Sequence, residues 1–206
     1  MSQQDSLVHS YLFLRRAIGF VGVLLPVVLV VGVLLTRGEF LDSISGYYYS
    51  PMRDVFIGAM CAVGAFLLSY RGYDGLDNAT ASAAGVAAVG LALFPTTPRD
   101  GHSPTQGVVG VVHLVFASVF FLALAYFCLV LFTKSDQTRP TPRKVQRNRV
   151  YVVCGWVILV CLALIVVANV LPHTDLHLAL WLESAAILAF GFAWLTKGEA
   201  ILGDVR

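Results

Sequence analysis

Three histidines and one glutamate in this sequence have the types and spacing that a metal site or a proton-transfer site needs. His173 and His177 are four residues apart, so on one continuous helix their imidazoles lie on the same face. His113 and Glu183 each lie about six residues inside the end of an apolar segment, which is about 9 Å of depth. An ionisable side chain at that depth is costly against lipid, so we expect both to face a bundle interior, where they could meet.

These four residues allow two interpretations, and the sequence leaves both open. In the first, a buried hydrogen bond between His113 and Glu183 pins two helices, while His173 and His177 belong to a solvated loop and a helix start. In the second, His113, His177 and either His173 or Glu183 bind a metal ion. Zinc is then the candidate cofactor, because imidazole and carboxylate ligands suit it.

A second polar group lies in the segment 43–54, which holds three serines, three tyrosines and an adjacent Arg53 and Asp54. Arg53 could bind a phosphate or carboxylate of a lipid headgroup, with Tyr48, Ser45 and Asp54 beside it as further ligand-binding residues. The structural alternative is that Asp54 balances a helix start and Arg53 reaches to the membrane interface. No catalytic residue is assigned, and Glu183 and Asp54 are the candidate proton carriers.

Composition determines the kind of element that must position these side chains. Of 206 residues, 58% are hydrophobic and 13% are charged, which excludes an ordinary soluble domain. Six membrane-spanning helices of about 20 residues would use roughly 120 residues, which matches the apolar inventory. Apolar segments separated by polar residues predict six spans, at 18–36, 53–70, 79–95, 107–133, 150–171 and 177–196.

We therefore predict an all-α fold, a polytopic bundle of six transmembrane helices that forms a single transmembrane domain over residues 1–206. Small residues in the third segment, including Ala81, Gly85 and Gly90, would let neighbouring backbones approach closely. Eleven of the fourteen Lys and Arg residues fall on one side of the membrane in this topology. Because basic residues favour the cytoplasmic side, both termini are predicted to be cytoplasmic and the histidine-rich face extracytoplasmic.

Several segments of the chain resemble an uncharacterised family of bacterial multi-helix membrane proteins. The segments that carry this resemblance are Ser43-Ile-Ser-Gly-Tyr-Tyr, Met52-Arg-Asp-Val-Phe-Ile-Gly58, Leu93-Phe-Pro-Thr96, His113-Leu-Val-Phe-Ala117 and Arg147-Asn-Arg-Val-Tyr151. That family is distantly similar to the autophagy-modulator and GPI-remodelling group of six-helix membrane proteins. The resemblance implies a bacterial inner membrane and carries no activity with it.

A weaker analogy connects the chain with the alkaline ceramidases and adiponectin-type receptors, which are intramembrane zinc hydrolases. Only His173 and His177 match their late H-x-x-x-H pair. Those proteins have seven helices and an early S-x-x-x-H arrangement. This chain has six predicted spans and offers His113 four positions before Ala117.

The sequence thus predicts an integral protein of the bacterial inner membrane whose extracytoplasmic polar pocket binds a lipid headgroup or a small ligand. A zinc-dependent intramembrane hydrolase of a lipid ester or amide is one alternative, and a small-solute or proton-coupled transporter is another. Whether the protein is an enzyme stays open. The expected partners are membrane lipids and no nucleic acid, and a homo-oligomer is left open.

Overall fold

The computed structural model describes residues 3–36, 39–72, 74–98, 101–135, 141–170 and 177–203. These residues form helices and no strands, which confirms the all-α prediction. The α-helices are α1 (Gln3–Thr36), α2 (Arg53–Ser69), α3 (Gly75–Leu93), α4 (Pro104–Tyr126), α5 (Pro142–Val170) and α6 (Leu178–Lys197). A 3-10 helix, η1 (Ser45–Tyr49), precedes α2, and a π-helical stretch, η2 (Phe127–Leu131), continues α4.

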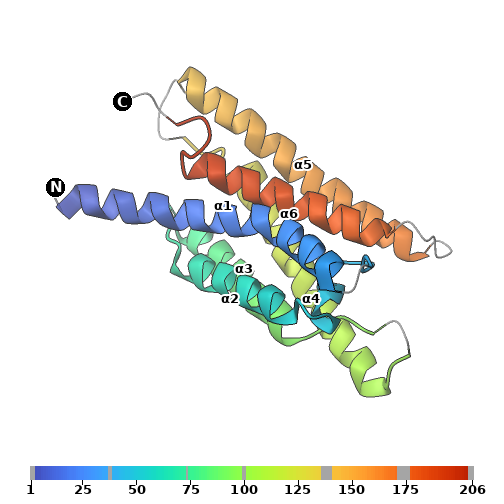
Figure 1. The fold of residues 1–206 in the computed structure, drawn as a ribbon. Helices are drawn as coiled ribbons and strands as arrows, with labels where there is room; N and C mark the ends of the chain where they lie inside the picture. Colours follow the sequence, from blue (N-terminus) through green and yellow to red (C-terminus); the bar gives the residue numbers. More distant parts are fainter. Residues whose placement is uncertain are drawn as a thin grey trace.

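The six α-helices form a ring. Each helix packs against its neighbours in the chain, and α6 packs against α1 to close the bundle (Figure 1). Because successive helices run in opposite directions, α1 begins and α6 ends at the same end of the bundle. We call this end, which carries Arg15, Lys144, Arg147 and Lys197, the basic end. The opposite end holds residues 39–52 and the first turn of α6, and we call it the polar cap.

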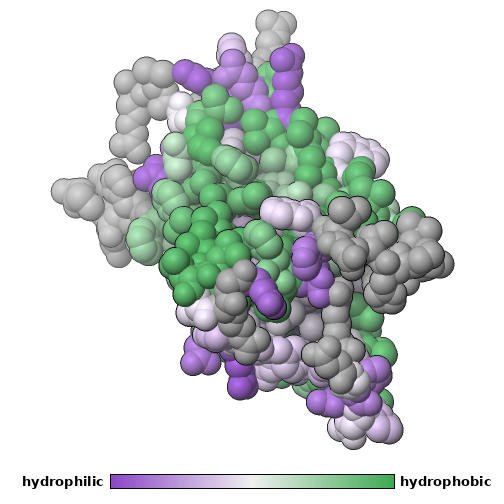
Figure 2. Space-filling view, turned by 45° about the vertical axis from the view of Figure 1, so that its right-hand side comes forward, coloured by the Kyte–Doolittle hydropathy of each residue, from purple (hydrophilic) through white to green (hydrophobic). Residues whose placement is uncertain are grey.

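Five of the described helical segments are long and apolar enough to cross a membrane: Ser10–Thr36, Gly75–Leu93, Pro104–Leu131, Pro142–Ala168 and Leu178–Lys197. The helix α2 has 17 residues and is shorter than these. Large apolar side chains such as Val115, Val153 and Val166 are more than half exposed around the ring. Figure 2 shows hydrophobic side chains across the middle of one face, with hydrophilic side chains toward its upper and lower edges. Helices of this length and apolarity are compatible with an integral membrane protein.

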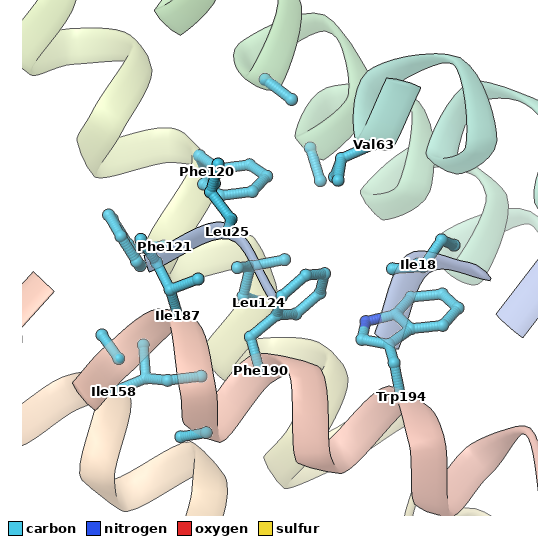
Figure 3. Close-up of a cluster of buried hydrophobic side chains, with 14 of the residues drawn as sticks. Ile18, Leu25, Val63, Phe120, Phe121, Leu124, Ile158, Ile187, Phe190 and Trp194 are labelled. Atoms are coloured by element: carbon cyan, nitrogen blue, oxygen red, sulfur yellow. The ribbon is translucent and has the colours of Figure 1, made fainter. Parts of the chain in front are cut away.

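Aromatic and aliphatic side chains fill the centre of the ring. Phe120 and Leu124 of α4 lie near Phe190 of α6 and Leu25 of α1, and Trp194 lies farther along α6 (Figure 3). Each of these five side chains is at most 5% exposed. The cavity described below lies between this core and the polar cap.

The helices α2 and α3 approach each other through glycine. A Cβ atom placed on Gly85 would lie 2.9 Å from the carbonyl oxygen of Gly64, and one on Gly64 would lie 3.0 Å from that of Gly85. No larger residue fits at either position without a backbone shift. The predicted close packing of the third segment is thereby confirmed, since Ala81, Gly85 and Gly90 are all buried.

Local capping sets where two of the helices begin. At α4, the side chain of Ser103 accepts a hydrogen bond from the N–H of Gln106, and the Gln106 side chain accepts one from the N–H of Ser103. This reciprocal pair satisfies two amides that the helix itself cannot, and Pro104 fits the first helical position. At α3, the Asp74 carboxylate accepts from the N–H groups of Leu76 and Asp77.

Candidate functional site

A cavity of about 50 Å³ lies inside the ring beneath the polar cap. Its lining comes from α1, η1, α2, α3, α4 and α6, and it is apolar except for Ser45, His113 and Glu183. About 10–15 Å³ of space measured in this way is enough for one water molecule. The cavity therefore has room for the end group of a molecule, and a whole lipid headgroup would require side chains to move.

His113 reaches this cavity from α4, and its ring is held in one orientation. Its Nδ1 atom lies 2.7 Å from the carbonyl oxygen of Phe94, and the residue is only 3% exposed. A carbonyl oxygen can only accept, so Nδ1 donates, which leaves Nε2 of the neutral ring as an acceptor. Among the described residues, Nε2 has no hydrogen-bond partner.

Glu183 reaches the same cavity from α6 and binds backbone. Its Oε2 atom accepts from the N–H of Ile44 at 2.7 Å and from the N–H of Ser45 at 3.2 Å. These two amides lie at the start of η1, where a helix leaves its N–H groups without internal partners. The carboxylate therefore ties the segment between α1 and α2 to α6.

Two further contacts tie this segment to the start of α6. Nδ1 of His177 lies 2.7 Å from Oδ1 of Asp42, and the carbonyl oxygen of Asp42 accepts from the N–H of Leu180 at 2.8 Å. His177 has a positive φ of 44° and its side chain does not cap α6. The backbone of Asp42 takes over that capping role. The ring of Phe40 packs beside the rings of His177 and Trp181.

The residues predicted to ligate a metal are thus engaged in separate interactions. His113 binds the end of α3, His177 binds Asp42, and Glu183 binds the start of η1. Within the part of the chain that the structure describes, no three His, Cys, Asp or Glu side chains are grouped as a metal ion would need. His173 lies outside the described residues, so a metal set that includes it stays a prediction.

The four residues predicted to bind a ligand divide between the cavity and the surface. Ser45 lines the cavity. Arg53 and Tyr48 pair with each other on the surface, with Nη2 of Arg53 3.1 Å from the Tyr48 hydroxyl and its guanidinium 4.6 Å from the ring centre. Asp54 is exposed in the first turn of α2 and does not line the cavity. The structure therefore does not bring these four side chains to one point.

Sequence reasoning identified His113 and Glu183 but missed their partners, which are backbone groups. The sequence did hold a signal that the Phe94 carbonyl is available as an acceptor. Pro95 disfavours a helical conformation at the preceding Phe94. The helix α3 therefore ends there, and its last carbonyl groups have no partners within the helix. Sequence reasoning did not single out Asp42. No residue-type pattern pointed to the amides of Ile44 and Ser45.

Comparison with protein-family models, with curated proteins and with solved structures found no match. The class of the protein therefore follows from its own fold. The described residues are all-helical, and five of their helices have sufficient length and apolarity to span a membrane, which is compatible with an integral membrane protein.

Proposed function

We propose that this protein binds the polar end of a membrane amphiphile, such as a lipid or long-chain molecule with a hydroxyl or amide N–H, without converting it. The observation that carries this proposal is the state of His113. Its ring is oriented by Phe94, and its acceptor Nε2 has no partner among the described residues, beside a cavity that is otherwise almost wholly apolar. An acceptor that lines a mainly apolar cavity and has no partner favours a ligand that donates a hydrogen bond.

The size and lining of the cavity support the same class of ligand. At about 50 Å³ it suits a small terminal group, and its apolar walls suit the first carbons of a chain. Oε2 of Glu183 is committed to the backbone of η1, while Oε1 of the same carboxyl group is available as a second acceptor. Ser45 completes the polar part of the lining.

The arrangement supports binding more than hydrolysis. Of the two candidate proton carriers, Glu183 holds η1 in place and Asp54 lies on the surface outside the cavity. The Ser45 hydroxyl lies 3.3 Å from that of Ser43, and no base is placed against it among the described residues. A nucleophile beside an oriented base, which acyl transfer needs, is not assembled here.

The proposed setting is a bacterial inner membrane, with α2 as a sixth span and both termini in the cytoplasm. At 1.5 Å per residue the 17 residues of α2 reach about 26 Å, close to the hydrocarbon thickness of a thin bilayer. Its place in the ring between α1 and α3 also supports a spanning role. Membrane-impermeant maleimide labelling of Tyr49→Cys and Gly75→Cys tests this, because both positions are exposed and lie at opposite ends of α2. Labelling of both from the same side would rule out α2 as a span.

The binding proposal is tested with a photoreactive probe, a long-chain alcohol that carries a diazirine on the carbon next to its hydroxyl group. Purified full-length protein in lipid nanodiscs is irradiated with the probe, and labelled peptides are mapped by mass spectrometry. We expect labels on α4 and α6 near His113 and Glu183. Ala117→Leu, which fills the cavity, should lower this labelling about tenfold, and His113→Leu should lower it severalfold.

Val115→Leu is the matched control for the cavity-filling variant. It lies on α4 near Ala117, adds apolar volume and is 57% exposed, so labelling should not change. The proposal is wrong if the probe labels only lipid-facing residues, or if Ala117→Leu is labelled in the cavity as strongly as the control. Thermal unfolding of each variant in the same nanodiscs establishes that the comparison is between folded proteins.

A further inference from the structure

Among the described residues, Glu183 is the acidic side chain that lines the cavity, and the rest of the lining is apolar apart from His113 and Ser45. Oε2 of Glu183 accepts from the N–H groups of Ile44 and Ser45, which are neutral donors. No Lys, Arg or His side chain in the described part of the chain forms an ion pair with this carboxyl group. A carboxylate in apolar surroundings is stabilised by a cationic partner. The cavity therefore favours a ligand that carries positive charge.

Hydrogen-bond acceptors of the cavity come from α6, α4 and η1. Oε1 of Glu183 has no hydrogen-bond partner among the described residues, because only Oε2 contacts the amides. Nε2 of His113 is a second acceptor, since Nδ1 of the same ring donates to the carbonyl oxygen of Phe94. The Ser45 hydroxyl lies 3.3 Å from that of Ser43, and a hydroxyl oxygen can accept a further hydrogen bond whichever of the two donates. A carboxylate with further acceptors beside it suits a cationic group that has several N–H donors.

We propose that the cavity binds a primary ammonium group at the end of a membrane amphiphile, and that Glu183 selects this group. A primary ammonium group carries one positive charge and three N–H donors, which match Oε1 of Glu183, Nε2 of His113 and the Ser45 hydroxyl. The inference rests on the proposed function and narrows its ligand class from any hydrogen-bond donor to a cationic one. The ammonium group belongs either to the ethanolamine headgroup of a phospholipid or to a single-chain amine.

The same lining disfavours other common end groups. A carboxylate or a phosphate would bring a like charge against Glu183. A hydroxyl group donates one hydrogen bond and gives the carboxylate no counter-charge. A quaternary ammonium group has the charge but no N–H donor, so Nε2 of His113 would gain no partner. The apolar walls, which include Phe56, Phe120 and Phe190, suit the carbon atoms next to the ammonium group.

Competition against the long-chain alcohol probe in phosphatidylcholine nanodiscs tests this selection. The competitors are a primary amine, an alcohol, a trimethylammonium compound and a carboxylic acid of one chain length, compared by their mole fraction in the bilayer. We expect the primary amine to suppress labelling of the cavity at about a tenfold lower mole fraction than the alcohol, as added charged hydrogen bonds predict. The trimethylammonium compound and the acid should compete no better than the alcohol. The proposal fails if the primary amine competes no better than the alcohol, or if the trimethylammonium compound competes as well as the primary amine.

Glu183→Gln tests whether Glu183 is the selecting residue. The amide keeps an oxygen for the N–H groups of Ile44 and Ser45 and removes the negative charge, so this variant should still bind the alcohol but lose the preference for the primary amine. Asp54→Asn is the matched control and should keep the preference, because Asp54 is an exposed acid at the same end of the bundle and does not line the cavity. A preference that survives in Glu183→Gln, or that Asp54→Asn also loses, overturns the proposal. If Glu183→Gln does not fold, the comparison of the primary amine with the trimethylammonium compound on wild-type protein decides.

Thermal unfolding in the same nanodiscs is a readout that does not depend on the probe. The primary amine should raise the unfolding temperature of wild-type protein more than the alcohol does, and it should lose this advantage on Glu183→Gln. If the alcohol probe never labels the cavity but this amine effect is present, the hydroxyl form of the proposed function fails and the ammonium inference stands. Labelling of the cavity by the probe without any preference for the amine gives the reverse result.

Nanodiscs in which phosphatidylethanolamine replaces part of the phosphatidylcholine separate the two sources of the ammonium group. If phosphatidylethanolamine lowers labelling of the cavity in wild-type protein but not in Glu183→Gln, the ammonium group is that of a phospholipid headgroup. If the single-chain amine competes and phosphatidylethanolamine does not, the ligand is a single-chain amine. If neither lowers labelling of wild-type protein, the cavity does not bind a primary ammonium group and the proposal is wrong.

Discussion

At the polar cap, Glu183 accepts hydrogen bonds from two backbone amides of η1, whereas at the basic end Asp77 accepts one from the ammonium group of Lys134. Both acids are partly or fully shielded from water, yet their partners differ in kind. The acid of the cap joins a loop to a helix, and its donors are neutral. The acid of the basic end joins the start of α3 to the residues after η2, and its donor is charged.

This difference follows from what each end must hold. The cap contains a connection of more than a dozen residues between α1 and α2, including η1, whose first amides need an acceptor. The basic end has short connections and many cations, so its acids serve as counter-charges. The two ends should therefore respond differently to mutation, salt and pH. The cap depends on satisfying backbone groups, and the basic end depends on charge.

The largest effect is expected from Glu183→Ala. The change leaves the N–H groups of Ile44 and Ser45 without their acceptor, so the free energy of unfolding should fall by about 3 kcal/mol. Glu199→Ala is the matched change at the other end. Its carboxyl group is about one third exposed and makes one long ion pair with Arg147, so the loss should be below about 1 kcal/mol. Equilibrium unfolding in mixed micelles measures both.

Glu183→Gln sharpens this prediction, because a neutral amide oxygen can still accept from the backbone. It should recover about half of the stability that Glu183→Ala loses, and the recovery should not depend on salt. Equal losses for the glutamine and alanine variants would mean that the charge of Glu183 matters more than its hydrogen bonds. The contrast between the two ends would then be wrong.

A smaller effect is expected from Asp77→Ala. Asp77 is 1% exposed, and its removal leaves Lys134 with Asp74 as its remaining carboxylate partner. The free energy of unfolding should fall by about 2 kcal/mol, and added salt should reduce the difference from wild type. Asp54→Ala, an exposed aspartate in the first turn of α2, is the control and should lose less than about 1 kcal/mol. If added salt does not change the loss for Asp77→Ala, then Asp77 stabilises the fold as Glu183 does at the cap, through its hydrogen bonds rather than its charge.

The pair of Asp42 and His177 should contribute less. Both side chains are about one third exposed, and Asp42→Asn keeps an acceptor for the imidazole and keeps the backbone carbonyl that caps α6. The expected loss is below about 1 kcal/mol in the same unfolding measurement. A loss larger than that of Glu183→Ala would show that the contact between Asp42 and His177 holds the cap more than Glu183 does.

The helices could be predicted from the sequence because apolar segments determine them. The predicted span 53–70 corresponds to Arg53–Ser69, and 177–196 corresponds to Leu178–Lys197. The helices α1 and α5 begin before the predicted spans at 18–36 and 150–171 do, at Gln3 and Pro142. In both cases the helix extends through polar residues beyond the apolar segment, and hydropathy detects only the apolar part.

The site could be predicted only in part. Residue types indicate how deep in the membrane a side chain lies and toward which side, but they do not indicate its hydrogen-bond partners. Depth placed His113 and Glu183 at a similar level, and both line one cavity. Their actual partners are a carbonyl group and two amides, which every residue possesses, so no pattern singles them out. A buried cluster of aromatic side chains at the basic end was missed for a similar reason. Its members come from four separate segments that only the folded bundle brings together: Tyr70, Phe127, Phe132, Tyr151 and Trp194.

The smallest and most specific prediction concerns pH at the basic end. Hydrogen bonds from the N–H of Asp77 and then from Lys134 hold the pKa of the Asp74 carboxyl group below its usual range. A carboxyl group with a lowered pKa stabilises the fold above its unfolded value, near pH 4, and this contribution is lost as pH falls through the folded pKa. Asp77 and then Asp74 raise the pKa of Lys134, so its contribution is fully present below its unfolded pKa, near pH 10, and is lost as pH rises through the higher folded pKa. Thermal unfolding between pH 6 and about pH 3 should therefore show a smaller decline for Asp74→Asn than for wild type, while Asp54→Asn should follow wild type. If both variants decline like wild type, Asp74 is not held by charge, and the two ends differ less than their contacts indicate.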